Sequence, residues 1–114
     1  MNDCIFCKII EGVIPVKKKI FEDDMVFAFE DINPQAPVHI LIIPKKHISG
    51  LDSVKREDIE ILGHIQIVAS KIAEDMNLKE GYRLLTNNGI DAGQTVAHLH
   101  YHLLGGRTFA WPPG

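Results

Sequence analysis

The chain has 114 residues, of which 46% are hydrophobic and 24% charged, and its formal net charge at pH 7 is −3. This length suits one domain with a small core, and the acidic balance gives no reason to expect a nucleic-acid partner. No apolar run reaches the roughly 18 residues needed to cross a membrane, and the N-terminus lacks the basic-then-apolar order of a signal peptide. We therefore expect one domain over residues 1–114, in a soluble, cytoplasmic protein with no membrane partner.

Residues 3–10 suit a short helix, with Asp3 as its N-cap and Gly12 just beyond its end. This segment carries two cysteines as Cys4-x-x-Cys7. In a cytoplasmic protein that spacing favours a metal or redox role over a structural disulfide. Taken alone, the pair leaves three interpretations open: a redox pair, half of a zinc site, or two core residues.

A hairpin is predicted next, with strands at residues 19–22 and 25–30 and two aspartates in the tight turn between them. Residues 31–37 then form a loop fixed by two prolines. Residues 38–43 are nearly all apolar and rich in β-branched side chains, which predicts a central strand covered on both faces. His39 interrupts this strand, and a lone histidine there is usually a core residue with satisfied hydrogen bonds.

A long helix is expected from about residue 54 to residue 76, capped by Asp52 or Ser53. His64 falls off its apolar stripe and is expected to face solvent. The core-facing stripe follows the helical period: Ile61, Leu62, Ile65, Val68, Ala69, Ile72 and Met76.

Residues 82–86 are predicted to form a fourth strand and residues 96–104 a fifth, whereas the Pro-rich end at 111–114 fits neither a helix nor a central strand. The elements together predict an α+β fold: a five-stranded, mostly antiparallel sheet with one long and one short helix. Because the core is small for this length, we also expect a symmetric homodimer that buries a helix or a sheet edge.

The predicted fifth strand carries His98, His100 and His102, one histidine at every second residue. Alternate side chains of a strand point to the same face, so the three imidazoles are expected on one face, with neighbours roughly 6.5–7 Å apart. Such a row suits a metal site, acid–base catalysis or a histidine nucleophile. The preceding loop, residues 86–95, is rich in turn-forming residues and offers backbone N–H groups for a phosphate oxygen.

A resemblance to a known family rests on five segments: residues 31–39, 43–47, 81–83, the His-φ-His-φ-His-φ-φ run at 98–104 (φ, apolar), and the Trp-Pro-Pro-Gly ending. Together they resemble the Hint branch of the histidine triad family, whose members are purine nucleoside phosphoramidases and adenylyl hydrolases. The intact third histidine and the ending argue against the nucleotidyltransferase and dinucleoside-polyphosphate branches. The resemblance implies a HIT-like fold and a hydrolase that cleaves phosphoramidate or acyl-adenylate bonds of AMP-type purine nucleotides through a nucleotidylyl-histidine.

The resemblance also implies roles for individual residues. His100 would be the nucleophile, His102 and His39 would contact or orient the phosphate, and Thr95, where relatives usually have serine, would lie near the leaving group. Asp31 would bind the ribose hydroxyls. The other implied nucleotide contacts are Phe6, Ile9, Ile14, Phe29 and Ile32 around the base, and Asn87 and Gly93 beside the phosphate.

Some members of this family with the cysteine pair bind zinc, and the matching residues here are Cys4, Cys7, His47 and His98. Two thiolates and two imidazoles suit tetrahedral zinc. The resemblance therefore implies a structural zinc ion and no organic cofactor. Two other functions remain open at this point: hydrolysis of dinucleoside polyphosphates, and a nucleotide-sensing interaction module whose turnover is incidental.

Overall fold

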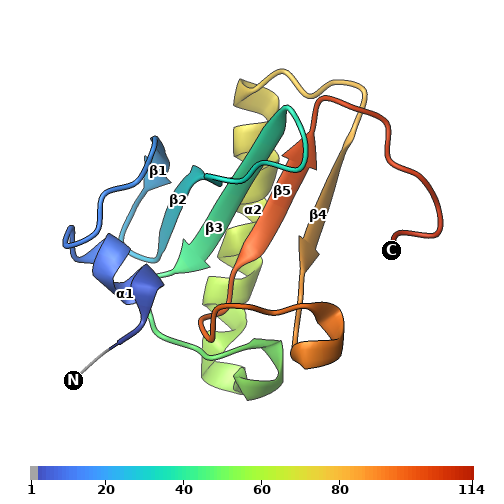
Figure 1. The fold of residues 1–114 in the computed structure, drawn as a ribbon. Helices are drawn as coiled ribbons and strands as arrows, with labels where there is room; N and C mark the ends of the chain where they lie inside the picture. Colours follow the sequence, from blue (N-terminus) through green and yellow to red (C-terminus); the bar gives the residue numbers. More distant parts are fainter. Residues whose placement is uncertain (1–2) are drawn as a thin grey trace.

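A computed structural model describes residues 3–114 and contains one antiparallel sheet with the strand order β1-β2-β3-β5-β4. The long helix α2 lies along one face of this sheet, and the short helix α1 lies near the β1–β3 end of the other face (Figure 1). This arrangement confirms the predicted α+β fold. The bounds are α1 Ile5–Ile10, β1 Lys19–Glu22, β2 Val26–Glu30, β3 Val38–Pro44, α2 Ile59–Asp75, β4 Tyr82–Thr86 and β5 Tyr101–Gly105, with 3₁₀ turns at Leu51–Ser53, Arg56–Asp58 and Ile90–Ala92.

Strand β3 lies between β2 and β5 and is buried on both faces, as its continuous apolar run predicts. Ile40 and Ile42 pack into the cluster beneath α2, whereas Leu41 and Ile43 pack into a second cluster with α1. Burying each such side chain contributes roughly 1.5–3 kcal/mol. The sheet therefore separates two cores, and the α1 face carries the polar residues described below.

Helix α1 is confirmed, but its predicted cap is wrong. Cys4 is the N-cap, because its Sγ accepts the backbone N–H of Cys7 at 3.4 Å. The chain leaves the helix before Gly12, whose φ of +81° lies in the left-handed region that favours glycine. The sequence favoured Asp3, because a carboxylate is a stronger hydrogen-bond acceptor than the sulfur of a cysteine.

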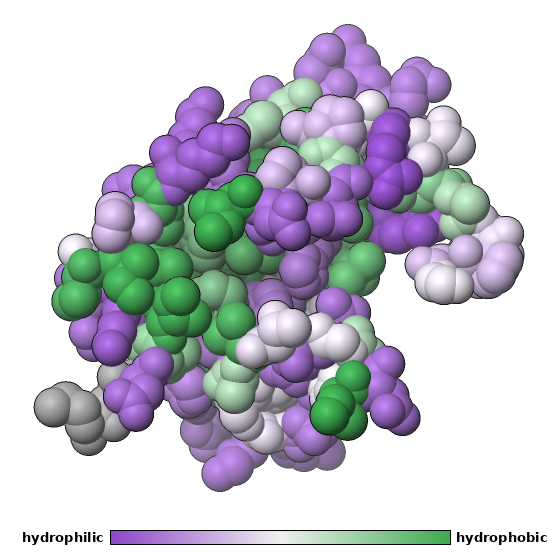
Figure 2. Space-filling view, in the orientation of Figure 1, coloured by the Kyte–Doolittle hydropathy of each residue, from purple (hydrophilic) through white to green (hydrophobic). Residues whose placement is uncertain are grey.

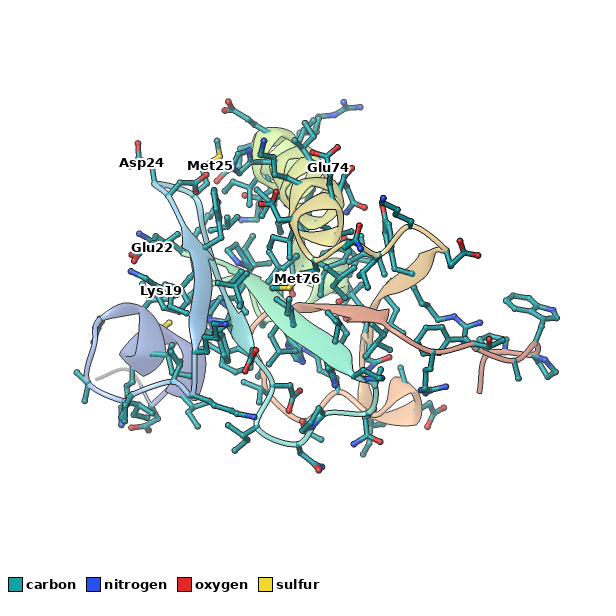
Figure 3. All side chains as sticks on the ribbon, turned by 90° about the horizontal axis from the view of Figure 1, so that it is seen from above. Lys19, Glu22, Asp24, Met25, Glu74 and Met76 are labelled. Carbon is teal, nitrogen blue, oxygen red and sulfur yellow. The ribbon has the colours of Figure 1, made fainter. Side chains whose placement is uncertain are left out.

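Helix α2 begins at Ile59, so the expected start near residue 54 and the caps at Asp52 and Ser53 are wrong. Val54 is extended, with φ −70° and ψ 153°, and breaks the chain into two 3₁₀ turns. The second turn is held by Asp58, whose carboxylate accepts the Lys55 N–H at 2.9 Å and pairs with Lys46 Nζ at 2.7 Å. The helical core stripe is confirmed except at Leu62, which is half-buried and is not part of the cluster. Met76, labelled in Figure 3, packs against the same cluster just after the helix.

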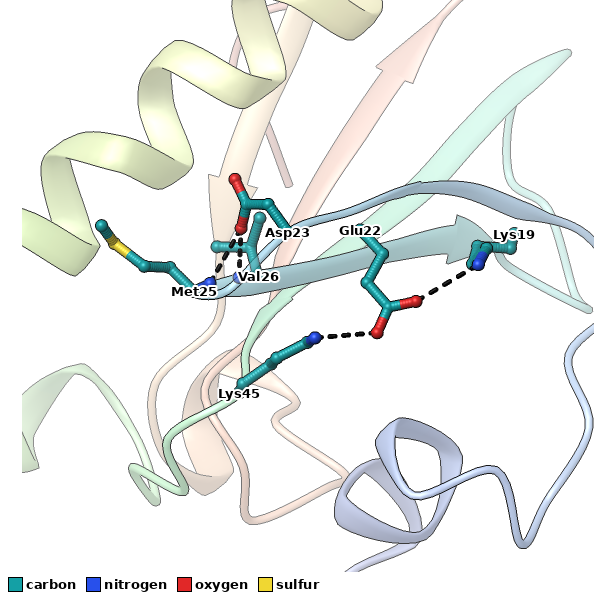
Figure 4. Close-up of polar contacts among 6 residues, drawn as sticks. All are labelled: Lys19, Glu22, Asp23, Met25, Val26 and Lys45. Atoms are coloured by element: carbon teal, nitrogen blue, oxygen red, sulfur yellow. Dashed lines mark hydrogen bonds and ion pairs between the residues drawn. The ribbon is translucent and has the colours of Figure 1, made fainter.

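His64 does not face solvent freely, which corrects the expectation for this residue. Its Nε2 lies 2.6 Å from Asp23 Oδ2, in the β1–β2 turn. The other carboxylate oxygen accepts the backbone N–H groups of Met25 and Val26 at 2.8 and 2.9 Å (Figure 4). Burial raises the pKa of Asp23, but these three hydrogen bonds outweigh it, so the net pKa is lowered. A tertiary contact between the turn and α2 thus decides the position of His64.

Strand β5 begins at Tyr101, so the fifth strand is shorter than the predicted 96–104 and only His102 of the three histidines lies in it. Residues before it bond elsewhere: the Leu99 N–H donates to Ile48 O at 2.6 Å, and Thr86 Oγ1 donates to His100 O at 2.7 Å. These bonds take the place of ladder hydrogen bonds that a longer strand would form. Within residues 3–114, α1 and α2 are both too short or too polar to cross a membrane.

Candidate functional site

Three imidazole rings lie in a row on the sheet face that also carries α1. His39 of β3 and His102 of β5 have ring centroids 5.2 Å apart, and His100 lies 5.1 Å from His102. The register explains the first pair, because His102 lies opposite Leu41 in the ladder, two residues from His39 and on the same face. The structure therefore brings together three of the four proposed catalytic residues.

The hydrogen bonds of His39 and His102 fix which nitrogens carry protons. The Gln35 N–H donates to His39 Nδ1 at 3.0 Å, so in the neutral ring the proton lies on Nε2. That Nε2–H donates to His102 Nδ1 at 2.9 Å, which leaves the proton of His102 on its own Nε2. His102 Nε2 is buried and has no hydrogen-bond partner among residues 3–114. A neutral N–H donor is thus available for a ligand oxygen.

Burial keeps these two rings neutral. It lowers the pKa of His39, although the nearby Asp31 carboxylate acts in the opposite direction. Burial, with the neighbouring His100 and His39, also lowers the pKa of His102 to about 4. At neutral pH His102 therefore donates a hydrogen bond without carrying a full charge.

His100 has the opposite arrangement. Its Nδ1–H donates to the backbone carbonyl of His98 at 2.7 Å, which leaves the lone pair on Nε2. The ring is 5% exposed and is packed edge-on against Phe6, with centroids 5.1 Å apart. Since Thr86 holds the His100 carbonyl, both the ring and its backbone are fixed. In the neutral ring, Nε2 of His100 therefore carries the lone pair, and the ring lies next to that of His102.

The loop before these histidines is held by side chains. Gln94 accepts the Gly89 N–H at 2.9 Å and donates to Ser49 O at 2.8 Å. Asn87 is half-buried at the start of the loop, whereas Gly93 and Thr95 are exposed near its end. The Gly93 N–H already bonds to Ile90 O at 3.0 Å. No hydrogen bond among residues 3–114 joins Asn87, Gly93 or Thr95 to the histidine row.

The residues expected around a base fall into two groups. Phe6, Ile9 and Phe29 are buried together, with Ile14 packed against them. Ile32 is 83% exposed in the 31–37 loop and stands apart from this cluster. Figure 2 shows apolar side chains gathered over α1 and the turn that follows it, on the same face of the molecule.

Asp31 lies beside the histidine row. Its Oδ1 accepts the Asn33 N–H at 2.8 Å, and its Oδ2 lies 3.4 Å from His39 Nε2. The carboxylate is therefore oriented by its own loop and keeps one oxygen near the row.

A second cluster joins α1 to the loops that follow β3 and precede β5. The Nδ1 atom of His98 lies 3.2 Å from Cys4 Sγ, 3.6 Å from Cys7 Sγ and 3.1 Å from His47 Nδ1. Cys7 Sγ lies 3.4 Å from His47 Nδ1, and all four ligand atoms lie within 4.8 Å of one another.

These separations fit tetrahedral zinc. With Zn–S bonds of about 2.3 Å and Zn–N bonds of about 2.0 Å, a tetrahedron places sulfur and nitrogen about 3.5 Å apart and two nitrogens about 3.3 Å apart. The Nε2–H of His98 donates to Pro44 O at 2.9 Å, so its Nδ1 carries the lone pair that a metal needs. Burial lowers the pKa of His98 to about 4, which keeps the ring neutral. Its ring thus serves the cysteine cluster and not the row.

A model of the HIT domain matches residues 12–109 of the chain. The chain belongs to the HIT family. It is 51% identical to an uncharacterised HIT-like protein of Synechocystis over 113 residues, covering 99% of this chain and 98% of that one. A 14 kDa zinc-binding protein of Zea mays is 50% identical over 112 residues, with 96% and 87% covered. A solved HIT family hydrolase of Legionella pneumophila has a TM-score of 0.95 at 51% identity, with 98% and 100% covered.

Sequence reasoning missed several groups that orient the site of this HIT protein. Gln35 and Pro44 act through their backbone, so their side-chain types carry no signal. Thr86 acts through its hydroxyl, and its position at the end of a strand before a turn-rich loop is a weak indication at best. Arg107, which bonds to Gln35 O at 3.1 Å, lies outside the motif.

Proposed function

We propose that this HIT protein hydrolyses purine nucleoside monophosphates activated at phosphorus, with phosphoramidates and acyl or aminoacyl adenylates as its substrates. The observation that carries the proposal is the fixed His100 ring, whose Nδ1–H is bound by the His98 carbonyl and whose Nε2 is left as a lone pair. A nitrogen nucleophile so oriented suits attack on phosphorus. Relatives of known structure from Legionella pneumophila and Clostridium thermocellum are named HIT family hydrolases, which supports hydrolysis as the class of reaction.

In the first step His100 Nε2 attacks the α-phosphorus, a P–N(His) bond forms, and the bond to the leaving amine or acyl group breaks. The amine of a phosphoramidate takes a proton from solvent water as it leaves, whereas an acyl adenylate releases a carboxylate that needs none; Thr95 is the hydroxyl assigned to the leaving-group side. The Nε2–H of His102 donates to a phosphoryl oxygen, where charge develops in the transition state. In the second step water attacks the same phosphorus and gives up a proton to solvent; the P–N(His) bond breaks, the nucleoside monophosphate is released and neutral His100 is restored.

Recognition of the nucleotide is assigned to the surroundings of the row. Asp31 accepts the ribose hydroxyls, since its Oδ2 already lies beside His39. The base contacts the apolar cluster of Phe6, Ile9, Ile14 and Phe29 on one side and the exposed Ile32 on another. Asn87 and the backbone at Gly93 line the phosphate. His39 orients His102 through its Nε2–H.

Zinc is proposed as a structural ion at Cys4, Cys7, His47 and His98, supported by their separations and by the zinc-binding relative from Zea mays. The cluster lies next to the reaction site, because the His98 carbonyl orients His100 and Phe6 packs against both rings. Bound zinc would tie α1 to the two loops. It would thereby hold the apolar cluster around Phe6 close to the nucleophile His100.

A homodimer is proposed as the working form. Strand β4 is the last strand of the sheet, and Tyr82 at its start is 43% exposed. The outer side of α2 exposes Ile59 at 62% and Ile67 at 67%. A two-fold contact through β4 and α2 would cover these side chains.

The proposed reaction is tested by steady-state kinetics on adenosine 5′-phosphoramidate and on a diadenosine polyphosphate, with wild-type protein and His100→Asn. We expect the phosphoramidate to be the better substrate and the variant to lose on the order of 10⁴ in rate while it still binds AMP. Preference for the diadenosine compound would assign the chain to dinucleoside polyphosphate hydrolysis. Tight AMP binding without turnover of either compound would support a nucleotide-sensing module instead.

A further inference from the structure

The segment that follows β5 packs closely on the 31–37 loop. A Cβ at Gly106, whose φ is +89°, would lie 2.9 Å from Pro37 Cβ, so this approach requires glycine. The next residue, Arg107, donates from Nε to Gln35 O at 3.1 Å. Its guanidinium lies over the Phe109 ring, 4.3 Å from the centroid, which holds the side chain in place.

The residue that Arg107 contacts is the one that sets the histidine row. Gln35 accepts from Arg107 with its carbonyl and donates its N–H to His39 Nδ1 at 3.0 Å. The order of donors then runs from Gln35 to His39, from His39 to His102, and from His102 Nε2 to the substrate side.

We propose that Arg107 is a positioning residue for the reaction: by holding Gln35, it keeps the His39–His102 pair in the order that makes His102 Nε2 a hydrogen-bond donor to the phosphoryl group. This inference rests on the proposed function. Arg107 touches neither substrate nor reacting atoms in this account and acts through Gln35.

The Gln35 N–H that donates to His39 Nδ1 matters because the other protonation states of His39 would weaken the site. If Nδ1 of His39 took a proton while Nε2 of His39 lost one, His102 would have to donate from its Nδ1. Its Nε2 would then carry a lone pair, which repels the phosphoryl oxygens. If Nδ1 of His39 took a proton while Nε2 kept its own, His39 would become a cation. A positioned donor at Nδ1 opposes both changes, because one nitrogen cannot accept that hydrogen bond and carry a proton.

The surroundings of His39 act on its pKa in opposite directions. The Asp31 carboxylate lies 3.4 Å from His39 Nε2 and raises the pKa of His39, whereas burial lowers it and is the larger of the two effects. Lys17 and Glu30 form an ion pair at 4.0 Å and line, with His39, a shallow cavity of about 130 Å³. The backbone donor from Gln35 therefore adds to the effect of burial in keeping His39 Nδ1 unprotonated.

The chain offers a matched control for Arg107. Arg83 lies over the same Phe109 ring at 5.0 Å and donates to Ala110 O at 3.0 Å, in the terminal segment and not in the 31–37 loop. Arg107→Gln and Arg83→Gln thus remove the same charge and loosen the same ring, but only the first removes the bond to Gln35.

The experiment measures kcat and KM for adenosine 5′-phosphoramidate from pH 5 to pH 9, and the ¹⁵N shifts of the His39 and His102 rings without ligand. For Arg107→Gln we expect kcat to fall roughly three- to tenfold, the scale of one exposed hydrogen bond, with KM nearly unchanged. The acidic limb of the profile should move to higher pH, because His39 takes its proton more readily. Arg107→Lys, which keeps a donor, should recover much of the rate, and Arg83→Gln should match wild type.

Gln35→Pro removes the N–H itself and should reduce kcat by more, while adding Arg107→Gln to it should reduce kcat no further. If Gln35→Pro does not fold, the two arginine variants decide. Equal kcat, equal pH profiles and equal ring shifts for Arg107→Gln and Arg83→Gln would overturn the inference. The ring shifts do not depend on turnover, so a wild-type protein without hydrolase activity would refute the proposed function and leave the role of Arg107 separately measurable.

Discussion

Removal of the metal ligands is the perturbation whose effect follows most directly from the geometry. The four ligand atoms come from three segments: α1 and its N-cap supply Cys7 and Cys4, the loop after β3 supplies His47, and the segment before β5 supplies His98. An ion that binds only when these segments are assembled stabilises the folded state by RT ln(1 + [Zn]/Kd). At zinc a thousandfold above Kd this amounts to about 4 kcal/mol.

For a domain of this size, 4 kcal/mol corresponds to a rise in Tm of roughly 15 °C. Thermal unfolding of chelator-treated protein, with and without one equivalent of zinc, should show that rise, and elemental analysis should find about one zinc per chain. Cys4→Ser with Cys7→Ser should remove both effects, and Mg²⁺, which prefers oxygen ligands, should not produce them. Hydrogen exchange should slow first in α1. Equal Tm values for treated and zinc-loaded wild type would refute the reasoning.

Three further predictions follow from other parts of the molecule. Because burial lowers the pKa of His102 to about 4, this residue binds a proton in the unfolded chain before it does so in the folded protein as pH falls below 6.5. The free energy of unfolding should therefore drop by up to about 2 kcal/mol between pH 7 and pH 5, and urea unfolding of His102→Gln should show a smaller drop. Calorimetry should show that a 2′-deoxynucleotide binds more weakly than its ribonucleotide by roughly 1–3 kcal/mol, because Asp31 loses a hydroxyl partner. Equal affinities would remove Asp31 from the site. Sedimentation at micromolar concentration should show a dimer that Ile67→Glu weakens, whereas a monomer in wild type would contradict the proposed contact.

The sheet could be predicted from the sequence because its signals are local. The apolar run of β3 and the two aspartates between β1 and β2 each act over a few residues, and the structure has both. The start of β5 could not be predicted, since it depends on the Leu99 N–H bonding to Ile48 O, a residue far away in the chain. The prediction that His64 faces solvent was wrong for the same reason, because Asp23 contacts it from another element.

The site divides in the same way. The pattern of three histidines contains two members of the row, His100 and His102, but it treats them and His98 as equivalent, whereas the structure places His98 with the cysteines. That division depends on where backbone carbonyls lie, which residue types do not encode. The grouping of the four metal ligands came from the resemblance and not from spacing, since His47 and His98 are far from Cys4 and Cys7 in sequence.

The central claim is that His100 Nε2 forms a covalent bond to the α-phosphorus. Wild-type protein mixed with adenosine 5′-phosphoramidate, quenched within one turnover under alkaline conditions that preserve phosphohistidine, should gain one adenylyl group by intact mass. Peptide mapping should assign that group to His100. His100→Asn should gain none, and His102→Gln should form the adduct more slowly at the same residue. Rapid product formation with no adduct in wild type, or an adduct on another residue, would contradict the account.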